Sequence, residues 1–186
     1  MSSKSTKVTL LALTALFLLP LVLAWLMYSG LIEFHPAETS NHGNLVDPPV
    51  VARLPPDFEK SELQSHWVLV YPFSEPCEDQ CRADLADLRQ VRRSLGRDAE
   101  RVRIVYLVGE GEKDRVARST ADIDVSALVL ADASGMLATQ LNRIGNGAFL
   151  IDPLGNVMMH YPAGSDPSGM RRDLEHLLRY AKTDPQ

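Results

Sequence analysis

The chain has no surplus of positive charge, because 19 lysines and arginines stand against 24 aspartates and glutamates and give a formal net charge of −5. A general nucleic-acid-binding protein gathers lysine and arginine on one face to neutralise phosphates, so the composition argues against that class. The nearest cluster, Arg92 and Arg93, falls on the predicted solvent-facing side of a helix. With 186 residues and no internal repeat, the chain also lacks the length for two full domains. One folded domain with a short accessory segment is expected.

Charged residues are absent from residues 8 to 28, and no lysine or arginine occurs from residue 8 until Arg53. An uncharged run of about 21 residues can cross a hydrocarbon layer about 30 Å thick as a helix. The run is longer than the core of a cleaved signal peptide, and no small-x-small cleavage site follows it. Lys4 and Lys7 precede it, so the positive-inside rule places residues 1–7 in the cytoplasm. The sequence therefore predicts a single transmembrane helix at 8–28, with everything after residue 30 outside the cytoplasm.

The next segment, 29–60, is rich in proline and weakly periodic, which predicts an extended tether. Beyond it the folded domain is expected over residues 61–182, followed by a tail at 183–186. Strand patterns occupy 66–71, 102–108, 148–152 and 157–161, with a shorter apolar run at 127–130; helix patterns occupy 78–95, 135–142 and 168–182. This order predicts an α/β fold, a central mixed sheet with helices on both faces.

Cysteine is scarce, and the only two, Cys77 and Cys81, fall where the first predicted strand leads into the first predicted helix. Two residues four apart on a helix lie on one face, and free N–H groups of a first turn favour a thiolate. Such a pair can cycle between dithiol and disulfide, or it can hold a soft metal ion such as Cu(I). Glu75, Glu78 and Asp79 oppose the thiolate, because nearby negative charge raises a thiol pKa.

A static disulfide is the alternative interpretation, since two cysteines in an exported domain commonly form one. A bridge that closes a loop of three residues removes little entropy from the unfolded chain, so it is a poor choice for stabilisation alone. The spacing favours a pair that reacts.

The segments HWVLVYPFSEPCEDQC (66–81) and GAFLIDPLGNVMMHYP (147–162), with RRDLEHLLRY (171–180) after them, resemble the Sco (SenC/PrrC) family of cytochrome c oxidase assembly factors. NHGNLVDPP, from residue 41 to 49, is similar to the stretch that opens the domain in such proteins. Over roughly residues 40–182 the chain looks most like the small Sco-like transmembrane proteins that accompany oxidase assembly genes in proteobacteria.

The resemblance implies a thioredoxin-like fold that faces the periplasm from a single-pass anchor in the inner membrane. It implies that Cys77 and Cys81 exchange disulfides or bind copper as Cu(I). It also implies two kinds of partner, subunit II of cytochrome c oxidase, whose copper centre needs reduced cysteines, and other oxidase assembly factors.

The chain departs from these relatives beside the strand predicted at 148–152. Copper-binding Sco proteins supply a histidine ligand shortly before that strand, whereas residues 141–147 contain none. Thioredoxins carry a cis-proline near that place, and Asn146 and Gly147 stand there instead. His160 is the best substitute for the missing ligand, although a histidine closing the second strand of a hairpin is ordinarily a surface residue.

The other histidines are weaker candidates. His176 should face water, and His66 opens the first strand at the end opposite the cysteines. His35 and His42 fall in the predicted tether, where a mobile ligand loses entropy on binding.

Three functions stay open on the sequence alone. The leading one is an assembly factor that reduces, or delivers copper to, the copper site of oxidase subunit II. The second is a general periplasmic thiol–disulfide oxidoreductase, and the third is a non-catalytic scaffold whose disulfide is structural.

Overall fold

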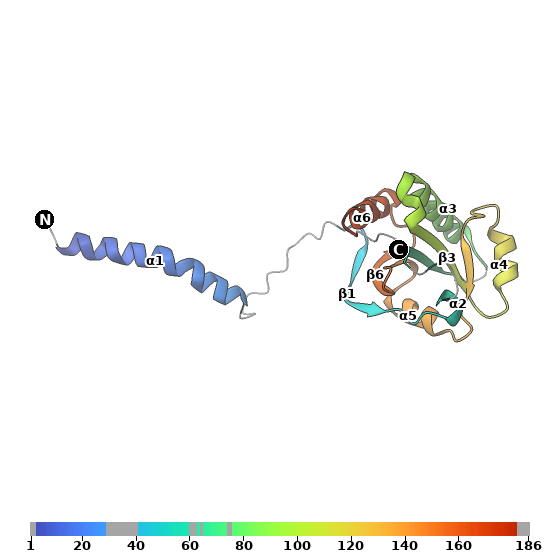
Figure 1. Cartoon of the computed structure of the whole chain (residues 1–186), viewed down its shortest axis with the longest axis horizontal. Helices are drawn as coiled ribbons and strands as arrows, with labels where there is room; N and C mark the ends of the chain where they lie inside the picture. The colour runs from blue at the N-terminus through green and yellow to red at the C-terminus, as the bar shows by residue number, and fades with distance from the viewer. Residues whose placement is uncertain (1–2, 29–40, 60–62, 64, 74–75, 182–186) are drawn as a thin grey trace. The chain divides into compact units, whose positions relative to one another are not determined.

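The computed structural model describes residues 3–28, 41–59, 63, 65–73 and 76–181, and the chain divides into two compact units, 1–40 and 41–186. In the first unit, helix α1 spans Ser3–Tyr28, with Pro20 inside it (Figure 1). The helix covers the run predicted to be the membrane anchor. Within the described part of the chain, no helix meets the combination of length and hydropathy expected of a membrane span. The anchor stays a prediction.

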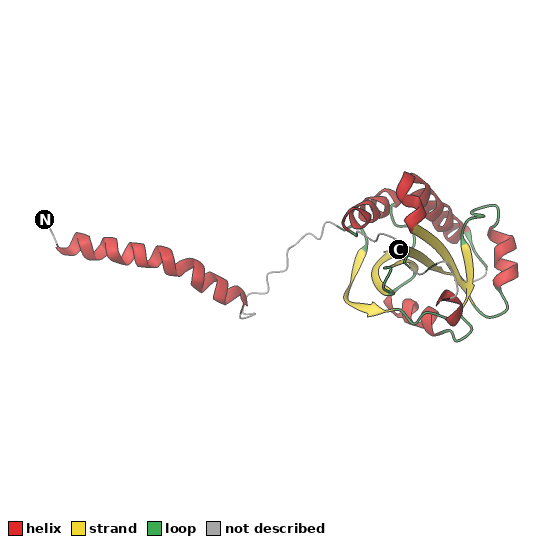
Figure 2. Ribbon diagram, in the orientation of Figure 1, coloured by secondary structure: helices red, strands yellow, loops and turns green. Residues whose placement is uncertain are grey.

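A six-stranded mixed sheet forms the centre of the second unit, in the order β1-β6-β5-β2-β3-β4. Its strands are drawn in yellow in Figure 2. The strands are β1 (Asn44–Val51), β2 (Trp67–Pro72), β3 (Val102–Val108), β4 (Leu128–Ala131), β5 (Gly147–Ile151) and β6 (Asn156–Pro162). β2, β3 and β4 are parallel, whereas β5 pairs antiparallel with both β2 and β6, and β1 pairs antiparallel with β6. The mixed sheet is confirmed.

Helices cover both faces of this sheet, also as predicted (Figure 1). The helical elements are α2 (Pro56–Glu59), α3 (Asp79–Ser94), the 3₁₀ helix η1 (Gly96–Arg101), α4 (Lys113–Thr120), α5 (Met136–Ile144) and α6 (Pro167–Tyr180). Successive strand residues point to opposite faces, so Leu69 and Tyr71 join the core under α3 and α6, whereas Val68 and Val70 join the core under α5. The apolar runs of β2 and β3 are buried on both sides for this reason.

Residues 44–51 correct the predicted tether at 29–60, because they form the edge strand β1. Pro48 and Pro49 made this stretch look like a loop. An edge strand tolerates proline where its N–H groups need no partner, and the pairing with β6 shifts register between Leu45 and Val50, the part that contains both prolines. The domain therefore begins near residue 41, about twenty residues before the predicted boundary at 61.

Asp173 of α6 holds the start of this segment in place. Its carboxylate, 3% exposed, accepts hydrogen bonds from the backbone N–H groups of His42 and Gly43 at 2.9–3.0 Å and from the Tyr161 hydroxyl at 3.2 Å. The His42 ring also lies against it, with Nδ1 3.1 Å from Oδ1. His42, predicted to belong to the tether, is thus fixed to the domain. His35 and the tail at 183–186 lie outside the described residues.

Local sequence explains where the helix next to the cysteines begins and ends. α3 follows β2 after a short loop and buries Leu85, Leu88 and Val91 on one face, the stripe that the sequence predicts. Gly96 has φ +59° just beyond the helix C-cap, a left-handed conformation that glycine adopts without strain. Because the connection from β2 to α3 is short and the apolar face of α3 is buried, the N-terminus of α3 lies at the carboxyl end of β2.

Candidate functional site

Cys77 and Cys81 are joined by a disulfide, with their Cα atoms 5.3 Å apart. Glu78 is the N-cap of α3, so Cys81 lies in the first turn and Cys77 precedes the helix. The sequence predicts that the two cysteines share one face of a helix, and this prediction is wrong. The turn into the helix brings the two residues together instead. Both side chains are half-buried and pack against the core under α3.

The charges around the disulfide act in opposite directions on a thiolate. Unpaired N–H groups of the first turn of a helix favour negative charge. The exposed carboxylates of Glu78 and Asp79 disfavour it. The guanidinium of Arg82 lies 2.7 Å from a carboxylate oxygen of Asp122, and both side chains are largely exposed, so this ion pair contributes little to stability.

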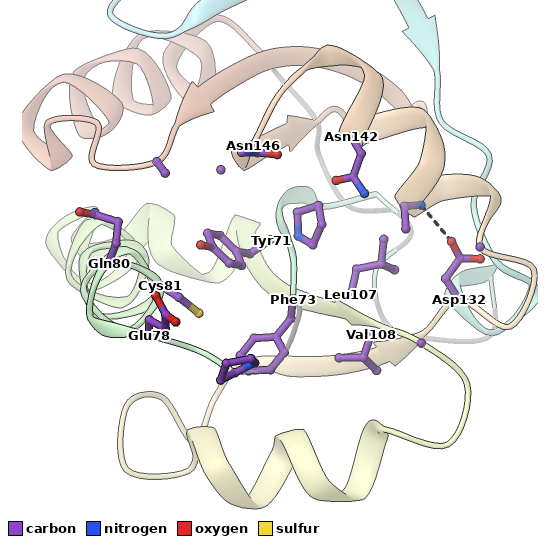
Figure 3. Close-up of a pocket in the computed structure, with 17 residues that line it drawn as sticks. Tyr71, Phe73, Glu78, Gln80, Cys81, Leu107, Val108, Asp132, Asn142 and Asn146 are labelled. Atoms are coloured by element: carbon purple, nitrogen blue, oxygen red, sulfur yellow. Dashed lines mark hydrogen bonds between the residues drawn. The ribbon is translucent and has the colours of Figure 1, made fainter.

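A groove of about 680 Å³ opens beside Cys81 (Figure 3). It lies at the carboxyl end of the parallel strands, where Phe73 follows β2, Gly109 follows β3 and Asp132 follows β4. Open α/β sheets commonly bind ligands at this edge. The groove therefore gives a second molecule access to the disulfide.

Two polar side chains that line the groove, Tyr71 and Gln80, share a hydrogen-bond partner, Asp84, which lies behind them. The Tyr71 hydroxyl donates to Asp84 at 3.2 Å, and the Gln80 side-chain amide donates to the other oxygen of that carboxylate at 2.8 Å. The backbone N–H of Gly164 adds a third bond to Asp84 at 2.9 Å. Burial, and then the charge and hydrogen bond of Asp84, raise the pKa of Tyr71 to about 12. The phenol is therefore a neutral donor at ordinary pH.

Asn146 and Gly147, in the loop before β5 and at its first residue, line the opposite wall of the groove. The Asn146 carbonyl accepts hydrogen bonds from His160 Nε2 at 2.9 Å and from the Ala163 N–H at 3.3 Å. Gly147 has φ +122°, and a Cβ there would overlap the Tyr161 carbonyl oxygen, so only glycine fits. Among the described residues the one cis peptide bond is Asp47–Pro48, far from this loop in sequence.

His160 lies on the other face of the sheet from the disulfide. It pairs with Phe149 across β5 and β6, and the two rings stack with centroids 4.8 Å apart. Phe149 belongs to the core under α5, whereas the cysteines pack against the core under α3. At 7% exposure His160 is not a surface residue either. The structure thus separates the candidate third copper ligand from the two sulfur atoms.

The remaining described histidines supply no substitute ligand. His176 is exposed and lies against the ring of Tyr180, and His66 precedes β2 at the end remote from the cysteines. Across the described residues, no group of three or more His, Cys, Asp or Glu side chains is placed to hold a metal ion. The donor set at the site is two cysteine sulfurs, which when reduced suits two-coordinate Cu(I) and does not suit Cu(II).

Sequence reasoning missed the polar side of the groove. Tyr71 ends a strand that was identified as buried, and Asp84 follows Cys81 by one helical turn. A carboxylate one turn beyond a reactive cysteine, beside an apolar stripe, was a usable signal. The partnership of Asp84 with Gly164 was not predictable, because it joins residues 80 positions apart.

Comparisons with known proteins place the fold. A family profile described as "Transmembrane-like, thioredoxin-like, C-terminal domain" matches residues 67–181. A crystal structure of Arabidopsis thaliana ScoI with copper bound is similar, with 16% identity and a TM-score of 0.51 over 63% of this chain and 86% of that one. A search of curated proteins finds no match.

Two further solved structures align less well. Bradyrhizobium japonicum ScoI with copper bound has 17% identity and a TM-score of 0.46 over 61% of this chain and 86% of that one. A thiol:disulfide interchange protein from Bacteroides sp. has 14% identity and a TM-score of 0.48 over 78% and 95% of the two chains. The family profile spans more than half of the present sequence. The fold is thioredoxin-like, and the chain belongs to the transmembrane-like, thioredoxin-like, C-terminal domain family.

Proposed function

We propose that the protein is a membrane-anchored thiol–disulfide exchange protein of the periplasm that keeps the copper-site cysteines of cytochrome c oxidase subunit II reduced. One observation carries the chemistry: the disulfide Cys77–Cys81 closes a loop of three residues at the start of α3 and borders an open groove. A bridge placed for stability would join distant segments, because longer loops gain more.

The exchange is written with the reduced pair as donor. A thiolate of the pair attacks one sulfur of a client disulfide, forms a mixed disulfide and releases the other client sulfur as a thiolate. The second cysteine then attacks the mixed disulfide, which forms the Cys77–Cys81 bond and releases the client dithiol. Two electrons pass to the client, so a separate dithiol donor has to restore the pair. The oxidised bond in the structure corresponds to the end of this sequence.

The compartment and the client rest on the sequence. The uncharged run at 8–28, preceded by Lys4 and Lys7, supports an anchor with the domain outside the cytoplasm. The resemblance of residues 66–81 and 147–162 to Sco proteins supports oxidase subunit II and other assembly factors as partners.

Copper delivery is the weaker form of this proposal. Cys77 and Cys81 would be the ligands, and a bound Cu(I) would supply the cargo for the client site. His160, on the other face of the sheet, adds nothing to the donor set. We therefore give thiol exchange precedence over copper transfer.

The test uses the reduced protein and an oxidised soluble fragment of subunit II whose copper-site cysteines are bridged. Alkylation of client thiols over time should show reduction by the wild-type chain and none by the Cys77→Ser/Cys81→Ser variant. The single variants Cys77→Ser and Cys81→Ser identify the attacking residue. The variant that keeps the attacking cysteine but lacks the second cysteine accumulates the mixed disulfide with the client. The disulfide should form and break at a potential of roughly −120 to −300 mV.

Insulin serves as the comparison substrate. Faster reduction of the subunit II fragment than of insulin supports the specific role, and equal rates would indicate a general oxidoreductase instead. A disulfide that stays oxidised across that whole range of potential would contradict exchange and leave the scaffold function.

A further inference from the structure

A second hollow, of about 410 Å³, lies beside the redox groove, and its charged lining is entirely basic. Arg53, in the loop after β1, and Arg143, in the last turn of α5, contribute the two charges. Val50, Met136 and Ile144 add apolar surface. In a chain with a net charge of −5, two cations on one hollow mark a local reversal of sign.

Neither guanidinium has a carboxylate partner among the described residues. The ion pairs of the domain involve other arginines, such as Arg82 and Arg171. Arg53 Nη1 makes only a weak contact with the Met136 sulfur at 4.0 Å. An arginine without a partner retains five donors in a planar fork that fits a carboxylate with two hydrogen bonds.

The wall between the two arginines is fixed by Gln140. Its side-chain oxygen accepts from the backbone N–H of Arg53 at 2.9 Å, and its amide donates to the Val51 carbonyl at 2.8 Å. These bonds join the loop after β1 to α5. The two Gln140 hydrogen bonds fix the backbone around the hollow before a ligand binds, which lowers the entropy cost of binding.

The hollow and the redox groove occupy adjacent sides of α5. Ala138 and Asn142 line the groove, whereas Thr139 and Arg143, one position further along the helix, line the hollow. One residue step turns a helix by about 100°, so a chain crossing α5 reaches both places. Gly135, at the N-terminus of α5, borders both.

We propose that Arg53 and Arg143 form an anion site that binds the carboxylate side chains of an acidic client segment lying across α5 from the redox groove. This inference rests on the proposed function for the identity of the client. The apolar lining favours a peptide over a bare inorganic anion, because the stems of peptide side chains can cover Met136 and Ile144.

Binding is measured with the full chain in an uncharged detergent, carrying Cys77→Ser and Cys81→Ser so that no disulfide exchange contributes. The probe is a fluorescent, cysteine-free peptide of about twelve residues rich in Asp and Glu, followed by anisotropy. A second peptide replaces every Asp by Asn and every Glu by Gln. The acidic peptide should bind, and Arg53→Gln/Arg143→Gln should weaken its binding roughly tenfold, from two partly exposed charge pairs.

Arg93→Gln/Arg97→Gln removes the same charge from exposed positions on α3 and η1 and should leave the affinity unchanged. Arg53→Lys/Arg143→Lys should retain part of the affinity that the Gln double variant loses. Raising the salt concentration should weaken binding of the acidic peptide to the chain with both arginines. If the Gln double variant does not fold, the Lys variant and the amide peptide still decide the question.

Equal binding of the two peptides, or an equal loss in the Arg93/Arg97 variant, would overturn the site. Displacement of the labelled peptide by inorganic phosphate at a lower concentration than the unlabelled acidic peptide requires would assign the arginines to phosphate instead. This result would also overturn the proposed site. The binding test does not depend on the proposed function, because the chain used in it lacks both cysteines. If that chain binds the acidic peptide but the wild-type chain fails to reduce the subunit II fragment, the proposed function is refuted and the anion site stands.

Discussion

The hydroxyl of Tyr71 donates a hydrogen bond to the carboxylate of Asp84 beside the redox groove. The pKa of Tyr71 is raised to about 12, so the phenol stays protonated at the pH values at which disulfide exchange is usually measured. The groove therefore carries a fixed donor on one wall and the Asn146 backbone on the other.

Replacing both Cys77 and Cys81 by serine should leave the domain folded. A bridge over three residues contributes only about 2 kcal/mol in the loop-entropy account. For a domain of this size the melting temperature should fall by a few degrees. Thermal unfolding of the fragment 41–186, followed by circular dichroism, measures the change. A variant without a cooperative transition would show that the disulfide is structural.

Copper binding separates the carrier from the reductant at the level of single residues. The reduced fragment 41–186 should bind Cu(I) weakly or moderately through Cys77 and Cys81 and should not hold Cu(II) with thiolate ligation. His160→Phe, which keeps a ring stacked on Phe149, should change neither result, because His160 lies behind the sheet. The titration is anaerobic, against competing chelators, with each single Cys→Ser variant. Tight Cu(II) binding lost with His160→Phe would contradict this placement.

At the scale of elements, β1 decides where the domain starts. A fragment beginning at residue 61 lacks β1 and lacks the backbone hydrogen bonds that Asp173 accepts from His42 and Gly43. Hydrogen bonds to a charged group are each worth about 1.5–3 kcal/mol, so losing them together with an edge strand removes a large part of ordinary domain stability. We expect the fragment 41–186 to unfold cooperatively and the fragment 61–186 to melt at least about 15 °C lower or to aggregate. Equal melting temperatures would restore the boundary at 61.

The N-terminus of α6 predicts a pH dependence. Hydrogen bonds from the N–H groups of Ser168 and Gly169 lower the pKa of Asp166, the helix N-cap. Its folded pKa lies below the unfolded value near 3.9, so its contribution is complete above that value and is lost as pH falls through the folded pKa. Asp166→Asn should therefore flatten the fall of melting temperature between roughly pH 5 and pH 2. Glu110→Gln removes an exposed loop charge and should not flatten it.

Most elements were predictable because their patterns are local. The strand predicted at 102–108 matches β3, and the helix predicted at 78–95 matches α3 to within a residue at each end. Two features were not local. The face occupied by His160 depends on β5–β6 pairing, whose register shifts between Leu150 and Ile151. The place of β1 depends on a partner more than a hundred residues away.

At the scale of the whole molecule, the charge asymmetry around residues 8–28 predicts the topology. Protease added to cells with a permeabilised outer membrane should digest the chain beyond about residue 30 while a cytoplasmic control protein survives. A domain that stays protected until the inner membrane is lysed would place it in the cytoplasm and remove the basis for a periplasmic client.

The bonds between His42 and Asp173 join residues 131 positions apart. Because β1 is the first strand of the domain to be synthesised and Asp173 lies on its last helix, the ring they close spans nearly the entire domain. Long-range closure of this kind is slow and comes late. A nascent chain therefore cannot pair β1 until β6 has emerged, nor fix His42 until α6 has emerged, and β1 has to wait, unpaired, through most of synthesis. Its two consecutive prolines suit that interval, because they make the waiting strand a poor template for pairing with another copy.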